Sequence, residues 1–249
     1  MAERARSFDR VAEEYERARA EYPPAVLDGL PLRDDAEVLD VGAGTGKLTR
    51  LLTERYRRVI AVEPLDGMRA VLERVVPAAE SHAGSAEAIP LSDASVDAVF
   101  AGQAFHWFAN DVAVSEMARV LRPGGVLALV WNEPDDDRPS PLPEEYQAYI
   151  RGLHDVSMAD FEGAPPWQDV IARGPFGEVH EANVPHDHVL DRAGVLDNAR
   201  SVSWIASLPD EEREATMRRL DELLGDGPYA IPNRANIMWA VRGASGAHV

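Results

Sequence analysis

Three glycines that alternate along residues 42–46 are the residues whose spacing points most directly to chemistry. They follow an apolar run, Val38 to Val41, which carries one acid, Asp40, and they precede a segment with helical patterning. Glycine permits positive φ angles and close approach of a ligand to the backbone, and a helix that begins there presents free N–H groups. A carboxylate beside such a turn suits an ammonium group and disfavours a phosphate. The turn is therefore predicted to hold an amino-acid ligand.

Two other kinds of glycine-rich loop do not match these residues. A phosphate-binding P-loop requires Gly at position 41 and Ser or Thr at position 48, where the chain has Val41 and Leu48. A dinucleotide fingerprint requires its third Gly at position 47, where the chain has Lys47. An alternating G-x-G-x-G turn is instead suited to a ligand that has no pyrophosphate.

A second acid, Glu63, ends the next apolar run, Arg58 to Val62. A carboxylate at the end of the second strand of a Rossmann-like sheet can accept hydrogen bonds from both hydroxyls of a ribose. Its position after the glycine turn favours this function over that of a solvated surface acid.

His106 is the best candidate for a general base. It follows the predicted fourth strand, at the edge where open α/β sheets bind ligands, and its ordinary pKa of about 6.5 suits proton transfer near neutrality. The alternative is that His106 pairs with the backbone or only shapes the acceptor site. Phe105, Trp107 and Phe108 are predicted to form apolar walls beside it.

Three other histidines raise the question of a metal site. His186 and His188 alternate with Asp187, so both would face the same side of a strand, and His180 lies nearby in the sequence. Two histidines without a clear third ligand are weak evidence, and no metal is predicted.

The elements that must position these residues follow from the patterning of the chain. The first half alternates short apolar runs with helical segments, which is typical of βαβ units and a parallel sheet. The second half is less regular. The predicted fold is α/β, a Rossmann-like doubly wound sheet of seven strands. Strands are expected at 37–41, 58–62, 80–83, 96–101, 126–131, within 178–190 and at 237–241, and helices at 47–56, 65–75, 111–121, 144–154 and 209–224.

Taken together, these segments resemble a class I S-adenosylmethionine-dependent methyltransferase. Within that superfamily the chain is similar to the branch that includes trans-aconitate methyltransferase and many bacterial small-molecule methyltransferases. The resemblance covers about residues 7–132 and thins beyond Asn132. It is carried by VLDVGAGTGKLT at 38–49, AVEP at 61–64 with Met68, GSAEAIPL at 84–91, QAFHWF at 103–108 and RVLRPGG at 119–125.

The resemblance implies S-adenosylmethionine as the cofactor, with Asp40 and the glycines at its methionine end and Glu63 at its ribose. Ser85 stands where many relatives have Asp, and its hydroxyl can replace the carboxylate as a hydrogen-bond acceptor. The implied cofactor-binding residues are Tyr15, Arg19, Tyr22, Asp40, Gly42, Ala43, Gly44, Gly46, Glu63, Pro64, Met68, Ser85, Ala86, Glu87 and Gln103, with His106 as the candidate catalytic residue.

An N-terminal helix is predicted because apolar residues recur at helical spacing from Phe8 through Val11 to Tyr22. The resemblance implies that this helix is a lid over the cofactor, with Arg19 paired to the cofactor's carboxylate. The alternative is an ordinary amphipathic helix with a solvated Arg19. The chain is expected to form one domain, with the lid in 1–30, the cofactor-binding core in 31–132, and the substrate-binding insertion and last strands in 133–249.

Composition narrows the class of protein. The chain has 249 residues, 45% of them hydrophobic, no Cys, and a formal net charge of -18. Such a charge repels polyanions, so nucleic acid is not expected as a partner. No apolar stretch approaches the roughly 20 residues of a membrane span, and residues 1–10 have no apolar signal core. A cytoplasmic enzyme, monomeric or homodimeric and without membrane partners, is expected.

The predicted function is methyl transfer from S-adenosylmethionine to a small-molecule acceptor, in the manner of secondary metabolism. An oxygen atom, from a carboxylate or a hydroxyl, is the first choice, and carbon and nitrogen stay open. One alternative is a cofactor-binding protein of the same fold that catalyses a different reaction, such as a cyclisation. A nicotinamide-dependent oxidoreductase is disfavoured by Lys47 and by the lack of a recognisable catalytic Tyr-Lys pair.

Overall fold

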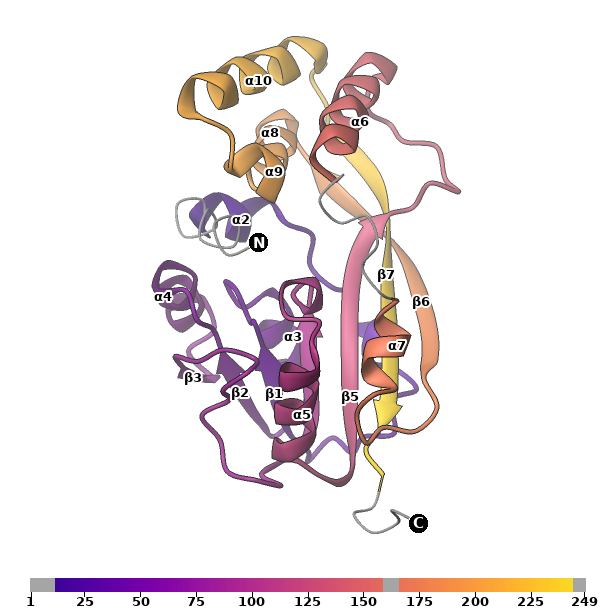
Figure 1. Ribbon diagram of the computed structural model, residues 1–249. Helices are drawn as coiled ribbons and strands as arrows, with labels where there is room; N and C mark the ends of the chain where they lie inside the picture. The colour runs from indigo at the N-terminus through magenta and orange to yellow at the C-terminus, as the bar shows by residue number, and fades with distance from the viewer. Residues whose placement is uncertain (1–11, 159–165, 244–249) are drawn as a thin grey trace. The chain divides into compact units, whose positions relative to one another are not determined.

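Strands and helices alternate through the first half of the computed structural model, which describes residues 12–158 and 166–243 (Figure 1). The expected helix residues Phe8 and Val11 lie outside the described residues. After α2 (Ala12–Ala18) and the short η2 (Pro24–Leu27), the elements are β1 (Glu37–Val41), α3 (Lys47–Arg55), β2 (Arg58–Val62), α4 (Asp66–Val75), β3 (Glu80–His82), β4 (Val96–Gly102), η3 (Phe105–Trp107), α5 (Asp111–Val120) and β5 (Leu121–Pro134).

The second half contributes more helix than strand. It comprises α6 (Glu144–Met158), α7 (Trp167–Ile171), β6 (His180–Leu190), α8 (Arg192–Arg200), α9 (Ser203–Ala206), α10 (Asp210–Leu223) and β7 (Tyr229–Val241). None of the helices in the described part of the chain is long and apolar enough to cross a membrane.

The seven strands form one sheet in the order β3-β2-β1-β4-β5-β7-β6, so the predicted α/β Rossmann-like sheet of seven strands is confirmed. Parallel pairings join the first five strands of that order. Because parallel strands end at one edge, the residues that follow β2, β1, β4 and β5 meet there. The strand order reverses direction between β1 and β4, which is where open α/β sheets bind ligands.

Side chains that alternate along the strands form a core on each face of the sheet. Leu127 and Leu129 of β5 pack on the face covered by α5 and α7, whereas Val126 and Ala128 pack on the face covered by α3. Strands that are buried on both faces are expected to be apolar throughout. This explains why the short runs at β1, β2, β4 and β5 could be recognised from the sequence.

Strand β5 is longer than the predicted 126–131. Leu121 pairs with Val96 ahead of a register irregularity, and Gly124 and Gly125 exchange backbone hydrogen bonds with Arg242 at 3.0 and 2.8 Å. Gly124 and Gly125, which precede the predicted strand, therefore lie within the observed one. Strand β7 also begins earlier than the predicted 237–241.

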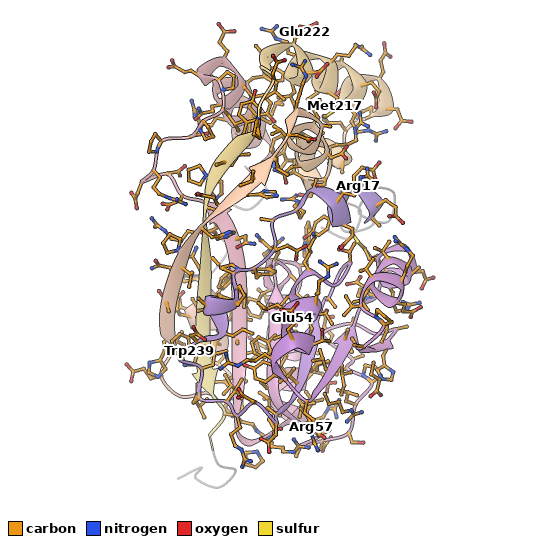
Figure 2. All side chains as sticks on the ribbon, turned by 180° about the vertical axis from the view of Figure 1, so that it is seen from behind. Arg17, Glu54, Arg57, Met217, Glu222 and Trp239 are labelled. Carbon is orange, nitrogen blue, oxygen red and sulfur yellow. The ribbon has the colours of Figure 1, made fainter. Side chains whose placement is uncertain are left out.

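The chain divides into two compact units. The sheet unit contains residues 22–133, 166–184 and 235–243, and the helical unit contains residues 12–21, 134–158 and 185–234. The core of the helical unit joins α6, α8, α9 and α10, with Met217 of α10 among its buried residues (Figure 2). Helix α2 packs against α8, where Arg17 pairs with Asp197 at 3.1 Å.

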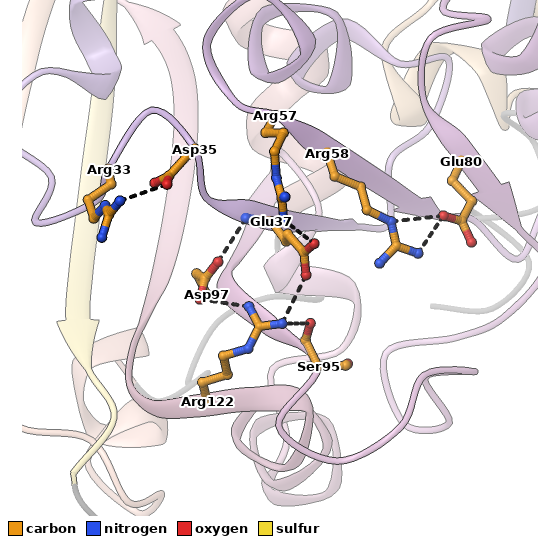
Figure 3. Close-up of polar contacts among 9 residues, drawn as sticks. All are labelled: Arg33, Asp35, Glu37, Arg57, Arg58, Glu80, Ser95, Asp97 and Arg122. Carbon is orange, nitrogen blue, oxygen red and sulfur yellow. Dashed lines mark hydrogen bonds and ion pairs between the residues drawn. The ribbon is translucent and has the colours of Figure 1, made fainter.

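Arginines and acids form a network at the amino ends of β1, β2 and β4 (Figure 3). This edge of the sheet is opposite the carboxyl ends of the strands, where ligands are expected to bind. Arg122 donates to Asp97 at 2.7 Å, to Glu37 at 2.9 Å and to the carbonyl oxygen of Ser95 at 2.8 Å. Asp97 also accepts the backbone N–H of Glu37 at 2.8 Å. The hydrogen bond from Arg122 lowers the pKa of Glu37. This network ties the starts of two neighbouring strands together.

Replacing Arg122 by glutamine is expected to lower the free energy of unfolding by about 1–2 kcal/mol, because three hydrogen bonds are lost from a partly exposed network. Glu37 has a lowered pKa in the folded chain, so its contribution is present near neutrality and is lost as the pH falls through the folded value. Urea unfolding at pH 7 and pH 4 measures both effects. An equal difference between wild type and variant at the two pH values would contradict the pairing.

Candidate active site

The glycine turn after β1 adopts the backbone conformation that its residues predict. Gly42, Gly44 and Gly46 have φ angles of 67°, 58° and 95°, which L-residues rarely adopt. The backbone N–H groups of Gly42 and Ala43 donate to the carbonyl oxygen of Val62 at 2.8 and 3.2 Å. The turn is therefore fixed to the end of β2.

The three positions require glycine for different reasons. A Cβ atom on Gly42 would lie 2.9 Å from that of Ala104, and one on Gly46 would lie 2.9 Å from a methyl carbon of Val76. These two positions need glycine because the protein itself packs closely against them. A Cβ on Gly44 would meet no described atom within 4 Å. Gly44 thus faces open space, as a backbone cradle for a ligand requires.

Asp40 is fully buried beside this turn. Its Oδ2 accepts the Thr49 hydroxyl at 2.7 Å, and its Oδ1 has no hydrogen-bond partner among the described residues. Burial raises the pKa of Asp40 to about 7, opposed by the hydrogen bond from Thr49 and assisted by the charge of Glu63. A buried carboxylate oxygen without a partner is costly, and a cationic ligand group would supply one.

Glu63 lies against the same turn. It is buried, and its carboxylate accepts the backbone N–H groups of Gly44 at 2.8 Å and Leu65 at 2.9 Å. These bonds join the glycine turn to the first turn of α4. Further along that region, Met68 is buried and Pro64 is exposed.

The loop after β3 begins beside Glu63, whose N–H donates to the carbonyl oxygen of His82 at 3.1 Å. Ala86 is buried, Ser85 is half-buried and Glu87 is exposed. A backbone bond from Ala88 to Ser85 at 3.2 Å closes a tight turn. The polar side chains of the loop thereby stay outside the core.

The end of β4 carries a second turn. Gln103 has a φ angle of 52°, uncommon for a residue other than glycine, and its N–H donates to Val130 at 2.9 Å. Its side-chain amide donates to the backbone oxygen of Asn132. These bonds hold the ends of β4 and β5 together, and strained backbone of this kind is often found at functional sites.

His106 lies in η3 and is partly buried. Its ring centre is 4.6 Å from that of Trp107, and burial lowers the pKa of His106 to about 4. No carboxylate among the described residues raises that pKa again. His106 is thus neutral at pH 7, which was not foreseen from the sequence.

Aromatic rings surround this turn more extensively than predicted. The rings of Phe105 and Phe108 are 5.9 Å apart in an edge-to-face arrangement, and Phe105 contacts Trp167 in the same way. Trp167 stacks on Trp131 with ring centres 4.1 Å apart. Trp131 lies in the last part of the apolar strand β5, a signal that could have placed it at the ligand edge, whereas nothing in the sequence pairs it with Trp167.

The predicted site residues of the N-terminal segment fall into different units. Tyr15 and Arg19 belong to the helical unit, where the Arg19 guanidinium lies 5.2 Å from the Tyr15 ring centre and donates to the carbonyl oxygen of Ser201 at 3.1 Å. Tyr22 is buried in the core of the sheet unit. The other predicted site residues, from Asp40 to His106, all belong to the sheet unit, where they lie at the carboxyl ends of its strands or on the loops and first helical turns that follow them.

The histidines of β6 do not gather ligands. His180 stacks against Trp239 of β7, a residue labelled in Figure 2. Across residues 12–158 and 166–243 no group of three or more His, Cys, Asp or Glu residues is arranged to hold a metal ion.

Comparison with known proteins assigns the chain to a family. A family model described as a methyltransferase domain matches residues 39–129. An uncharacterized methyltransferase of Mycobacterium tuberculosis (strain ATCC 25618 / H37Rv) is 39% identical over 222 residues, which span 89% of this chain and 87% of that protein. The chain belongs to the S-adenosylmethionine-dependent methyltransferases.

Two further similarities bear on the methyltransferase. A malonyl-[acyl-carrier protein] O-methyltransferase of Coxiella burnetii (strain RSA 493 / Nine Mile phase I) is 40% identical over 173 residues, covering 69% of this chain and 52% of that protein. A solved structure from Anaeromyxobacter dehalogenans, described as a type II methyltransferase, has a TM-score of 0.57 and 27% identity, covering 91% of this chain and 97% of the other.

The residues of this methyltransferase fit S-adenosylmethionine. The cofactor carries an ammonium group, which suits the unpartnered oxygen of Asp40, and it has no phosphate, in keeping with the absence of a P-loop pattern. The open face of Gly44 allows a ligand to lie against the backbone. The predicted cofactor therefore agrees both with the family and with the donor set of the turn.

Proposed function

We propose that this methyltransferase methylates a carboxylate oxygen of a small-molecule acceptor. The observation that carries the proposal is that His106 is partly buried and neutral at pH 7. Burial lowers the pKa of this side chain to about 4, and it follows the strand end at which the acceptor would approach the cofactor. A neutral, weakly basic imidazole at this position favours an acceptor that arrives already deprotonated.

The choice between a carboxylate and a hydroxyl rests on basicity. A hydroxyl nucleophile must lose a proton, and a general base works best when its pKa lies near the operating pH. A base whose conjugate acid has a pKa of about 4 is far from that condition. A carboxylic acid, with an ordinary pKa of about 4, is ionised at neutral pH without help. The acceptor oxygen then needs only to be aligned.

Alignment is a task that the aromatic residues at this turn can perform. When bound, the cofactor supplies an electrophilic methyl group on a positively charged sulfur. Phe105 is fully buried and packs edge-to-face against both Phe108 and Trp167. The partly buried rings of Phe108 and Trp167 would exclude water and limit the positions open to the acceptor. Holding two reacting groups in line can account for a large part of a rate enhancement.

The acceptor is proposed to be small on grounds of charge and relationship. A net charge of -18 disfavours nucleic acid. The Coxiella burnetii relative is named as a malonyl-[acyl-carrier protein] O-methyltransferase, and the malonyl group in that name offers a carboxylate oxygen. The finer resemblance to the trans-aconitate methyltransferase branch points to the same chemistry.

Roles within the cofactor site are part of the proposal. Asp40 would bind the ammonium group, Glu63 the ribose hydroxyls, and the segment 85–87 the edge of the adenine. Tyr15, Arg19 and Tyr22 would belong to a lid, in accordance with the family resemblance, although Arg19 is engaged with Ser201 in the helical unit.

Replacing His106 by alanine or glutamine is expected to lower kcat by less than about tenfold and to raise KM for the acceptor, because the side chain shapes the site without moving a proton. With S-adenosylmethionine saturating at every pH, the kcat of the wild type should be flat between about pH 6 and 8.5, since His106 is neutral throughout that range. The measurement is transfer of labelled methyl from S-adenosylmethionine to a panel of mono- and dicarboxylic acids and to the matching primary alcohols.

The comparison of each carboxylic acid with its matching primary alcohol decides between a carboxylate and a hydroxyl acceptor. Methyl esters should form from the acids and no ethers from the alcohols. Methylation of the alcohols alone, with a 10²–10⁴-fold loss of kcat in both His106 variants and loss of a pKa from the pH profile, would instead assign a general base and a hydroxyl acceptor.

A further inference from the structure

The loop at residues 84–91 is held to helix α5 by side chains that the cofactor site as described does not use. Glu116 Oε2 accepts the backbone N–H of Ile89 at 3.1 Å. Arg119, one turn later on the same helix, donates to the carbonyl oxygens of Ile89 at 3.0 Å and Leu91 at 2.8 Å. One acid and one base therefore hold both the donor and the acceptor groups of the loop backbone.

The two helix residues also fix each other. Arg119 and Glu116 form two hydrogen bonds, at 2.7 and 2.8 Å, and Arg119 further pairs with Asp93 at 2.8 Å just beyond the loop. Hydrogen bonds from Arg119 lower the pKa of Glu116, so the carboxylate is ionised. A planar guanidinium bound at several points loses little freedom per bond, which makes this pair a rigid support.

The start of α5 makes a third contact with the loop. The side-chain oxygen of Asn110 accepts the N–H groups of Val112 and Ala113, both at 3.0 Å, which caps the helix. Its amide group donates to Glu87 at 3.1 Å. One end of the helix thus reaches a side chain of the loop, and the last two turns reach its backbone.

Buried residues within the loop further restrict the backbone that carries its polar side chains. Ala86 and Ile89 are buried in the core that also contains Met117 of α5. A Cβ atom on Gly84 would lie 2.8 Å from a ring carbon of Pro90, so the two ends of the loop are closely packed. The backbone that presents Ser85 and Glu87 has few alternative positions while these contacts hold.

We infer that Glu116 and Arg119 are positioning residues that set the selectivity of the enzyme for adenine as the base of its cofactor. The inference rests on the proposed placement of residues 85–87 at the adenine edge. Adenine and hypoxanthine have nearly the same shape, but adenine has an exocyclic amino group where hypoxanthine has a carbonyl oxygen, and the neighbouring ring nitrogen changes from a hydrogen-bond acceptor to a donor. Discriminating a hydrogen-bond donor from an acceptor requires protein groups held in a fixed position, because a mobile loop can adjust to either.

The test compares binding of S-adenosylhomocysteine and S-inosylhomocysteine by calorimetry. In Arg119→Gln, affinity for the adenosyl compound is expected to fall about tenfold and affinity for the inosyl compound less than twofold, so the preference of the wild type largely disappears. Glu116→Gln preserves the size of the side chain and removes its charge, and it should weaken the preference less. If Arg119→Gln is too unstable to purify, Glu116→Gln can be used to measure the same preference.

Arg122 provides a matched control. It is also an arginine with several hydrogen bonds to acids and a carbonyl oxygen, three residues further along the chain, but at the opposite sheet edge. Arg122→Gln should lower the unfolding temperature and leave the ratio of the two affinities unchanged. A general loss of stability is therefore separable from a loss of base selectivity.

A fourth variant, Glu87→Ala, separates the inference from its premise. If Glu87→Ala lowers the preference for the adenosyl compound while Arg119→Gln and Glu116→Gln leave it intact or weaken both ligands equally, the positioning function is wrong. If none of the three alters the preference, the placement of residues 85–87 at the adenine is wrong as well. Loss of preference in Arg119→Gln alongside normal behaviour of Arg122→Gln supports the inference.

Discussion

Replacing Asp40 by asparagine is expected to weaken binding of S-adenosylhomocysteine by about 10- to 100-fold and to remove most of its dependence on pH between 6 and 8. The substitution keeps the size of the side chain and an oxygen that can accept the Thr49 hydroxyl. It removes the negative charge that the proposed function pairs with the ammonium group of the cofactor. Calorimetric titration of wild type and variant over this pH range is the measurement.

The direction of the pH effect follows from the raised pKa of Asp40. With a pKa of about 7, the carboxyl group is mostly protonated at pH 6 and mostly ionised at pH 8 in the ligand-free protein. An ammonium group binds the ionised form, so wild-type affinity should rise by about tenfold from pH 6 to pH 8, with proton release at the lower pH. In Asp40→Asn there is no such proton to release.

Thr49→Val is the matched control. The hydrogen bond from Thr49 lowers the pKa of Asp40, so its removal should raise that pKa and shift the affinity profile toward higher pH. The profile of Thr49→Val should keep its slope, whereas that of Asp40→Asn should lose it. An Asp40→Asn protein with wild-type affinity and a wild-type pH profile would remove Asp40 from the cofactor site.

Glu63→Gln is expected to weaken cofactor binding by at least about tenfold and also to lower the unfolding temperature. Two effects combine at this residue. Its carboxylate is proposed to bind the ribose hydroxyls, and the structure shows that it also accepts the N–H groups of Gly44 and Leu65. A glutamine amide has one acceptor oxygen for these groups, so the glycine turn loses part of its support.

Comparison of two ligands separates these effects. S-Adenosylhomocysteine and its 2′-deoxy analogue should bind Glu63→Gln with similar affinity, because the ribose contact is already impaired, while the wild type should prefer the compound with both hydroxyls. Glu80→Gln, an acid paired with Arg58 at the amino end of β3, should keep the wild-type preference. Undiminished discrimination by Glu63→Gln would assign Glu63 to the turn alone.

Much of the sheet could be predicted because its strands are buried on both faces and their apolar runs are short and separate. The same holds for the glycine turn, since positive φ angles at Gly42, Gly44 and Gly46 restrict the residue type. The reason for each glycine could not be predicted. Close packing at Gly42 and Gly46 involves Ala104 and Val76, which lie on other segments of the chain.

Features that depend on residues far apart in the sequence could not be predicted from it. The low pKa of His106 results from burial by the folded chain, and the stacking of Trp131 on Trp167 joins a strand to a helix well beyond it. Helices α8 and α9 were not predicted because their apolar residues are few, although Asp191 is a recognisable N-cap that accepts the N–H of Gly194 at 2.7 Å. Glu116 and Arg119 have the three-residue spacing of an ordinary helical ion pair, and nothing in that spacing indicates their bonds to the loop at 84–91.

The separation of the arginine network from the ligand groups has a consequence for how this enzyme can evolve. Arg122, Glu37 and Asp97 act at the amino ends of the strands, whereas Asp40 and Glu63 act at or near the carboxyl ends. Mutations that strengthen or weaken the network of Arg122, Glu37 and Asp97 alter the stability of the protein to heat and acid. They leave the residues at the carboxyl ends of the strands unchanged. A lineage can therefore adapt to a new temperature at one edge and to a new acceptor at the other, with little interference between the two.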